Sequence, residues 1–167
     1  MKVILDMAVS SDGFVAKVDG DSNWVSPITE KSFVQRCKDA GCVIVGRKTF
    51  DQYRGEIYPV KGVINIVLTS KPVSYDEANV LIAHTPKGAL AIANGKGFKS
   101  VLLAGGGLVS GSFVNGGLLN EAFLTFHPLI LGDGIKLFSG CKKVVNMKLL
   151  SSEVIGDGVV QNHYKIN

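Results

Sequence analysis

The sequence has few cysteines, and they form no recognisable pattern. Cys37, Cys42 and Cys141 are an odd number of residues without C-x-x-C spacing. This argues against a disulfide framework and favours a protein of the reducing cytosol. The three histidines are far apart in the sequence and lack the spacing of zinc ligands, so we expect no bound metal.

A membrane-spanning segment and a basic cluster are also lacking. No apolar run approaches the length of about 20 residues that crosses a bilayer as a helix. Met1–Asp6 carries charge inside its apolar stretch and has no cleavage-site pattern, so it indicates a first strand rather than a signal peptide. The net charge of +4 comes from scattered lysines and arginines, without a basic arm or stripe. We therefore expect a cytoplasmic protein that binds neither nucleic acid nor a membrane.

Short apolar runs alternate with helix-like segments over most of the chain, and the C-terminal part favours strands alone. With 167 residues, 46% of them hydrophobic, the chain can bury the core of one domain, residues 1–167. This order predicts an α/β domain with a mostly parallel central sheet, flanking helices and an antiparallel C-terminal edge hairpin. The expected strands are 3–9, 42–45, 63–68, 80–83, 100–104, 121–131, 149–155 and 159–166, and the strand over 121–131 is expected to be interrupted near His127 and Pro128. The expected helices are 27–40, 47–53, 85–93 and 108–114, and 10–26 is expected to be a loop.

The most informative motif is a glycine turn between a buried strand and a helix. The apolar run Val101–Ala104 ends in Gly105, Gly106 and Gly107, and helix-like residues follow from Leu108. Glycines allow a ligand to approach the backbone, and a helix start offers free N–H groups, so this segment predicts a phosphate or pyrophosphate site. Such glycines also form tight turns without any ligand. The dinucleotide pattern G-x-G-x-x-G is not met, because Ser110 stands where the third glycine belongs.

Two further strand ends carry groups that suit phosphates. Gly46 is followed by Arg47, Lys48 and Thr49, and the strand ending at Leu68 is followed by Thr69, Ser70 and Lys71. In an open α/β sheet, ligands bind beyond the carboxyl ends of the parallel strands, so these loops and the glycine turn are expected to lie on one edge. Arginine forks, lysine charges and hydroxyls bind phosphates. The three loops together predict a site for a dinucleotide with an additional ribose phosphate.

The chain resembles a known family in motifs that span almost its whole length. The order of its elements is similar to the dihydrofolate reductase fold. It resembles more closely the reductase family typified by the C-terminal domain of the bifunctional riboflavin-biosynthesis deaminase/reductase. The motifs that carry the resemblance are Met7–Gly13, Asn23–Ser26, Gly46–Phe50, Leu68–Lys71, Ala104–Gly107, Pro128–Gly132 with Leu137–Phe138, and His163–Tyr164.

The resemblance implies an NADPH-dependent reductase and assigns the cofactor to the three loops. It implies that Gly46–Thr49 meets the cofactor phosphates and that Ser70 and Lys71 meet the adenosine ribose phosphate. The glycine turn with Leu108 would then hold the pyrophosphate. Ala8 and the loop at Asp12 and Gly13 would lie beside the nicotinamide.

The implied reaction is hydride transfer to a small pterin- or pyrimidine-type substrate, most like that of 5-amino-6-(5-phosphoribosylamino)uracil reductase of riboflavin biosynthesis. Dihydrofolate reductase is an alternative, although those enzymes carry an acidic residue where this chain has Thr29. A non-catalytic nucleotide-binding module is another. A hydrolase using Ser110 or Ser112 is disfavoured, because neither lies in a G-x-S-x-G motif.

Catalysis would also need a proton, and the sequence offers few donors. Asp12, Thr29 and Glu30 are the candidate catalytic residues, with an ordered water as another source. Trp24, Phe33 and Phe50 are candidates for the substrate-binding wall, because flat rings pack on flat heterocycles. Ordinary core packing is an equal interpretation of such rings. The apolar C-terminal strands could pair across a two-fold axis, which predicts a homodimer.

Overall fold

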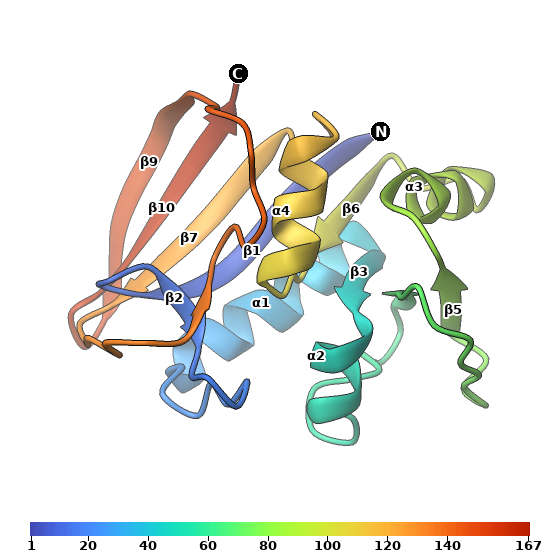
Figure 1. Cartoon of the computed structure of the whole chain (residues 1–167), viewed down its shortest axis with the longest axis horizontal. Coiled ribbons are helices and arrows are strands. Elements are labelled where there is room, and N and C mark those ends of the chain that lie inside the picture. The colour runs from blue at the N-terminus through green and yellow to red at the C-terminus, as the bar shows by residue number, and fades with distance from the viewer.

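Short apolar runs form the centre of an eight-stranded sheet in the computed structural model, which describes residues 1–167. Six neighbouring strands are parallel, and the last two, at the C-terminal edge, are antiparallel (Figure 1). The predicted α/β class, with its antiparallel edge hairpin, is therefore confirmed. The order across the sheet is β5 (Val80–Ala83), β4 (Ile64–Leu68), β3 (Cys42–Gly46), β6 (Ser100–Leu103), β1 (Lys2–Ser10), β7 (Glu121–His127), β10 (Val159–Ile166) and β9 (Met147–Gly156).

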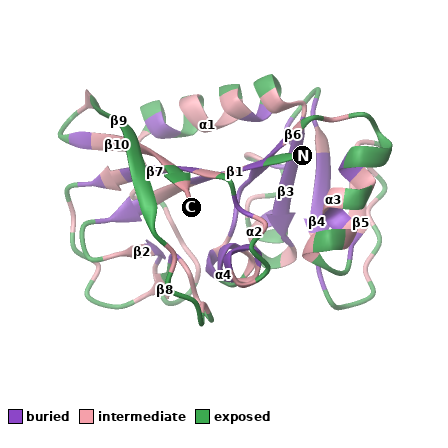
Figure 2. Ribbon diagram, turned by 90° about the horizontal axis from the view of Figure 1, so that it is seen from above, coloured by how far each residue is buried: buried purple, intermediate pink, exposed green.

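Helices cover both faces of this sheet. Helix α1 (Pro27–Ala40) lies on one face and α4 (Gly107–Asn115) on the other (Figure 2). The remaining helices are α2 (Arg47–Gln52) and α3 (Pro86–Gly95). Because both faces are buried, the side chains of one strand belong to two cores: Ile44 packs in one and Val43 in the other. This explains why the central strands are continuous apolar runs rather than alternating ones.

The ends of α1 and α3 follow from local sequence signals. Pro27 begins α1, and Gly41 ends it in a left-handed conformation, with its N–H donating to the carbonyl groups of Cys37 and Lys38. Helix α3 begins after Thr85, whose side chain accepts a hydrogen bond from the N–H of Gly88. Helices were expected over 27–40 and 85–93, and both are present.

Two parts of the fold differ from the prediction. The expected loop 10–26 contains β2 (Phe14–Ala16), which pairs with β8 (Ile135–Lys136) in a small second sheet. Strands of three and two residues are too short to show a period in the sequence. The strand expected over 121–131 ends at its predicted interruption, at His127, and does not resume beyond it, because Pro128 has no N–H to donate to a neighbouring strand.

The described residues contain no disulfide and no grouping that would hold a metal ion. Cys37, Cys42 and Cys141 are all unpaired, and burial raises the pKa of the Cys42 thiol to about 11. No group of three or more histidine, cysteine, aspartate or glutamate side chains is close enough to coordinate a metal. None of the helices has the length and apolar character needed to cross a membrane.

Helix α4 packs against the segment before β9 at a position that only glycine tolerates. A Cβ atom on Gly111 would lie 2.2 Å from the backbone oxygen of Ser139. We expect Gly111→Ala to lower the free energy of unfolding by about 1–3 kcal/mol, as overpacking of a core does. Gly95→Ala is the matched control, since a Cβ there meets no atom within 4 Å and alanine favours a helix. Urea denaturation of both variants measures the difference, and equal stability of the two would contradict this packing.

Candidate functional site

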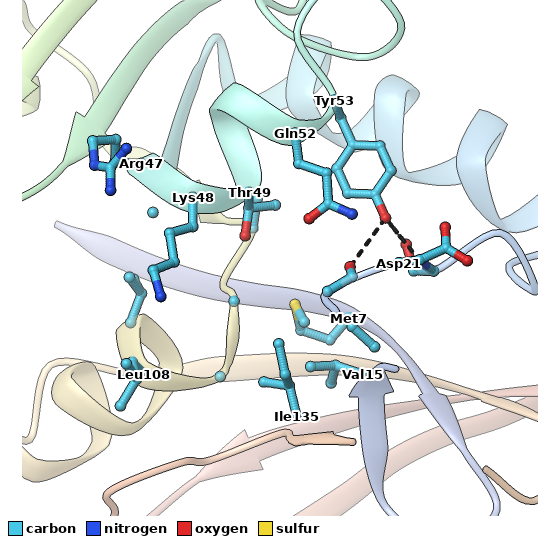
Figure 3. A pocket seen from close by; sticks show the side chains of 18 of the residues that line it. Met7, Val15, Asp21, Arg47, Lys48, Thr49, Gln52, Tyr53, Leu108 and Ile135 are labelled. Carbon is cyan, nitrogen blue, oxygen red and sulfur yellow. Dashed lines mark hydrogen bonds between the residues drawn. The ribbon is translucent and has the colours of Figure 1, made fainter. Parts of the chain in front are cut away.

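A cleft of about 1480 Å³ lies beyond the carboxyl ends of the parallel strands. Residues that follow β3, β4 and β6 line it, together with residues of β1, α1, α2 and α4. Figure 3 shows Met7 of β1, Thr49 of α2 and Leu108 of α4 around this space. The three loops expected on one edge of the sheet therefore lie on one cleft. Its size suits a dinucleotide together with a small substrate.

The glycine turn supplies bare backbone N–H groups to this cleft. Gly106 precedes α4 without a capping side chain, and the N–H groups of Gly107, Leu108 and Val109 donate to no other group of the chain. The turn also lies against β3, because the N–H of Gly46 donates to the carbonyl of Gly105 at 2.7 Å. Unpaired N–H groups at the positive end of a helix dipole bind anions.

The two cations after β3 are arranged differently. The Nη1 of Arg47 lies 2.7 Å from Oδ2 of Asp51, and the hydroxyl of Tyr75 donates to the other oxygen of Asp51. Lys48 makes no ion pair, and its side chain extends into the space between α2 and α4 (Figure 3). Lys48 is therefore the cation free to meet an anion in the cleft, while Arg47 is partly neutralised.

A second polar group lies at the end of β4. Ser70, Lys71 and His84 all line the cleft and are exposed. The Nδ1 of His84 lies 2.8 Å from the carbonyl oxygen of Thr69, and because a carbonyl only accepts, Nδ1 carries the proton. The N–H of Lys71 donates to Oγ1 of Thr69 at 3.1 Å. Thr69 thus holds His84 and the backbone of Lys71 on the same side of the cleft.

The other end of the cleft is apolar and aromatic. Ala8, Phe33, Ile57 and Tyr58 line it, and the rings of Phe33 and Tyr58 lie edge to face with centroids 6.4 Å apart. Tyr58 is only 4% exposed, and burial raises the pKa of its phenol well above the ordinary value, so it is neutral. An apolar pocket with a few polar groups is typical of a site for a heterocyclic ligand.

Thr29 also lines the cleft, and its hydroxyl belongs to a hydrogen-bonded cluster with a buried histidine. The Oγ1 of Thr29 lies 2.9 Å from Oγ of Ser26 and 3.3 Å from Nε2 of His127. Nδ1 of His127 donates to the carbonyl of Thr125, so Nε2 accepts the N–H of Ser26 at 3.2 Å. Burial lowers the pKa of His127, so the ring is neutral. Its hydrogen bond with the N–H of Ser26, the residue before α1, holds the start of that helix.

Most of the predicted site residues line this cleft. The apolar end has Phe33, and the catalytic candidates Thr29 and Glu30 are beside it. The predicted cofactor-binding residues that line the cleft are Ala8, Gly46, Arg47, Lys48, Thr49, Ser70, Lys71, Gly106, Gly107 and Leu108.

Asp12, Gly13, Gly105, Trp24 and Phe50 are not among the residues that line the cleft. The carboxylate of Asp12 accepts hydrogen bonds from the hydroxyl of Ser10 and from two backbone N–H groups at 131 and 132, and the Ser10 bond contributes most to lowering its pKa. The ring of Trp24 lies edge to face with His127 at 5.2 Å. Phe50 is fully buried in the core, 5.6 Å from the ring of Tyr58.

Some residues of the cleft were not predicted. Asp6, Tyr53, Ile57, Tyr58 and Lys136 all line it. Asp6 had a visible signal, because a carboxylate buried in an apolar strand is destabilising unless it has a partner. The other four lie in irregular or very short elements whose position depends on tertiary contacts.

The family model for the RibD C-terminal domain matches residues 1–161. The chain belongs to this family. It is 27% identical over 180 residues to the uncharacterized protein YyaP of Bacillus subtilis (strain 168). The alignment covers 99% of this chain and 95% of YyaP. The predicted resemblance to the riboflavin-biosynthesis reductase domain is confirmed, and membership of the family supports an oxidoreductase.

Solved structures confirm the dihydrofolate reductase-like fold of this RibD C-terminal domain. A candidate riboflavin biosynthesis protein of Shewanella sp. PV-4 superposes with a TM-score of 0.82 and 23% identity, covering 100% of this chain and 99% of that one. Dihydrofolate reductase of Enterococcus faecalis, solved with NADP(H) and RAB-propyl, superposes with a TM-score of 0.79 and 21% identity. That superposition covers 99% of this chain and 96% of the reductase.

The neutral ring of His127 predicts a stability that depends on pH. Because the folded protein disfavours protonation, the contribution of His127 is complete above pH about 6.5, the ordinary pKa of histidine, and is lost as the pH falls below it. We expect the melting temperature of the parent to fall more steeply below that pH than the melting temperature of His127→Gln. His84→Gln, at an exposed histidine, is the control and should follow the parent. Parallel curves for parent and His127→Gln would contradict the assignment.

Proposed function

We propose that this RibD C-terminal domain is an NADPH-dependent reductase that transfers a hydride to a small pterin- or pyrimidine-type substrate. One observation carries the proposal: three strand-end loops with groups suited to phosphates line the same cleft as an apolar, aromatic pocket. Groups suited to phosphates lie at one end of the cleft, and an apolar, aromatic pocket lies at the other. They match the phosphate groups and the nicotinamide ring of a nicotinamide dinucleotide.

The residues present fit the phosphates of such a cofactor. The N–H groups at the start of α4 are unpaired, and a Cβ on Gly106 would lie 3.3 Å from Oγ1 of Thr49, so a side chain would narrow the phosphate path. Lys48 would meet the pyrophosphate from the opposite wall. Ser70 and Lys71, with the ring of His84 beside them, would hold the additional ribose phosphate that distinguishes NADPH from NADH.

When bound, the cofactor supplies the hydride, and the protein orients it and excludes water. Ala8, Phe33 and Tyr58 form the apolar wall beside the nicotinamide and the substrate ring. The hydroxyl of Thr29 is held between Ser26 and His127, so it can orient a water, but an aliphatic hydroxyl is too weak an acid to supply the proton itself. In this proposal the proton comes from Glu30 or from a water held near Thr29.

The substrate that we propose is most like that of 5-amino-6-(5-phosphoribosylamino)uracil reductase. Membership of the RibD C-terminal domain family supports it, as does the likeness to a candidate riboflavin biosynthesis protein. Thr29, at the position where dihydrofolate reductases carry an acid, argues against dihydrofolate itself. The same threonine favours a second candidate function, a nucleotide-binding module without catalysis.

Titration with NADPH and NADH, followed by the fluorescence of Trp24 and by calorimetry, tests the proposal. We expect tight binding of NADPH and weak binding of NADH. Consumption of NADPH with dihydropterins or aminopyrimidine ribosides would exclude the non-catalytic module. Binding of neither cofactor would overturn the reductase assignment.

The preference for NADPH should depend on Lys71. We expect Lys71→Gln to weaken NADPH binding about tenfold, because a hydrogen bond to a charged group is lost, and to leave NADH binding unchanged. Lys61→Gln is the matched control, since Lys61 is an exposed lysine outside the cleft. Calorimetric titration measures both cofactors. An equal loss for NADPH and NADH would show that Lys71 does not contact the additional phosphate.

We also propose a homodimer that forms through β9. This strand is the outer strand of the sheet, so one of its edges has no partner within the chain. It carries exposed apolar side chains at Met147, Leu149, Leu150 and Val154. An unpaired edge with apolar side chains is suited to antiparallel pairing with a second copy across a two-fold axis.

A lysine on this strand should separate the two copies. By light scattering we expect the parent to have twice the mass of the 17.7 kDa chain and Val154→Lys to have the mass of one chain, because a charge at the shared edge is costly to bury. Val144→Lys is the control, since this valine is 98% exposed and lies outside β9. A monomeric parent would refute the dimer.

A further inference from the structure

A carboxylate lies near the middle of the buried strand β1. Leu5 and Val9 belong to the core on the α4 side, whereas Asp6 points to the α1 side of the sheet and is only 3% exposed. Burial raises the pKa of the Asp6 carboxyl, and the guanidinium of Arg36 opposes that rise. Because a buried carboxylate without partners is strongly destabilising, its surroundings show how it is accommodated.

Arg36 of α1 binds one oxygen of this carboxylate from outside the cleft. Its Nε donates to Oδ2 of Asp6, and its Nη1 donates to Oε1 of Gln161 at 3.3 Å. The guanidinium carbon lies 4.7 Å from the centre of the Phe123 ring, which stacks on His163 with centroids 4.0 Å apart. Arg36 is thus fixed by three different strands and does not itself line the cleft.

The second oxygen of Asp6 has no partner in the protein. No hydrogen bond within the chain reaches Oδ1, although Asp6 lines the cleft. The hydroxyl of Tyr58 also makes no hydrogen bond within the chain, and Tyr58 lines the same cleft. Neither atom is sealed inside the core, so both are open to the cleft and free to bind a ligand there.

We propose that Asp6, held by Arg36 and aided by the hydroxyl of Tyr58, binds the N–H edge of the heterocyclic substrate. The ligand class is a planar ring that carries an amino group next to a ring nitrogen, as in a 2-aminopyrimidine. Asp6 accepts its N–H groups, and the rings of Phe33 and Tyr58 wall its faces. This inference rests on the proposed function, since it assigns a role within the same cleft.

Asp6 suits this role better than the other acidic residue near the aromatic pocket. Glu30 is exposed at the first turn of α1, where water weakens its interactions with a ligand. Asp6 is only 3% exposed and Arg36 fixes its position, so a hydrogen bond to it discriminates more strongly between rings with and without an amino group.

Binding of two matched probes to the NADPH-bound protein tests the proposal. The probes are 2,4-diamino-6,7-dimethylpteridine and 6,7-dimethylpteridine, which lacks the amino groups. We expect the parent to prefer the diamino probe by about tenfold to a hundredfold, as for hydrogen bonds to a charged group, and Asp6→Asn to lose most of that preference. Asp39→Asn, at an exposed carboxylate of α1, is the matched control and should keep it.

NADPH affinity separates this inference from the proposed function. If the parent binds NADPH and does not distinguish the two probes, the role of Asp6 is overturned while the cofactor site stands. If Glu30→Gln rather than Asp6→Asn removes the preference, the role of Asp6 is likewise overturned. Should Asp6→Asn fold poorly, Asp6→Leu combined with Arg36→Leu removes the ion pair as a unit, which proteins tolerate. That variant should bind NADPH as the parent does and show no preference.

Discussion

The glycine turn can pack on β1, and the start of α4 on β8, only because the residues at these contacts have no side chains. A Cβ on Gly105 would lie 2.7 Å from the sulfur of Met7, and one on Gly107 would lie 2.1 Å from the backbone oxygen of Lys136. These contacts aim the start of α4 at the carboxyl ends of the strands, where its N–H groups remain unpaired. The end of the cleft that we propose for the cofactor phosphates, here called the phosphate end, depends on this close packing.

The two ends of the cleft are built by different means. At the phosphate end, the groups are backbone N–H groups and exposed side chains such as Lys48 and Lys71, which remain in contact with water. At the ring-binding end, the polar atoms of Asp6, Thr29 and Tyr58 are buried among apolar side chains. Charges in water attract over distance and are screened by salt, whereas buried polar groups act only at contact. The first end therefore suits capture of an anion, and the second suits discrimination between similar rings.

Much of the fold follows from signals that are local in the sequence. Val43 and Ile44 could be assigned to a buried strand because both faces of the sheet are covered, and Pro27 and Gly41 mark the two ends of α1. The three loops that line the cleft could be found because each directly follows a strand. These features depend on neighbours along the chain, which a single sequence displays.

The features that were missed depend on contacts between distant residues. Asp6 pairs with Arg36, which is 30 positions away, and Asp12 bonds to backbone groups 119 and 120 positions away. The sequence shows that Trp24 and Phe50 are aromatic, but not that one packs on His127 and the other lies inside the core. Whether a ring faces a cleft or the core is decided by tertiary packing, which no local pattern records.

The hydrogen bonds of Asp12 bear on how the protein responds to a ligand. They join the end of β1 to the backbone at Leu131 and Gly132 before any ligand arrives. A segment that is already ordered loses little conformational entropy on binding, so more of the contact energy appears as affinity. The loop after β1 does not line the cleft itself, but it is ordered next to β2 and β8, whose residues Val15 and Ile135 do line it. A ligand that contacts these two strands therefore meets a surface that is already in place.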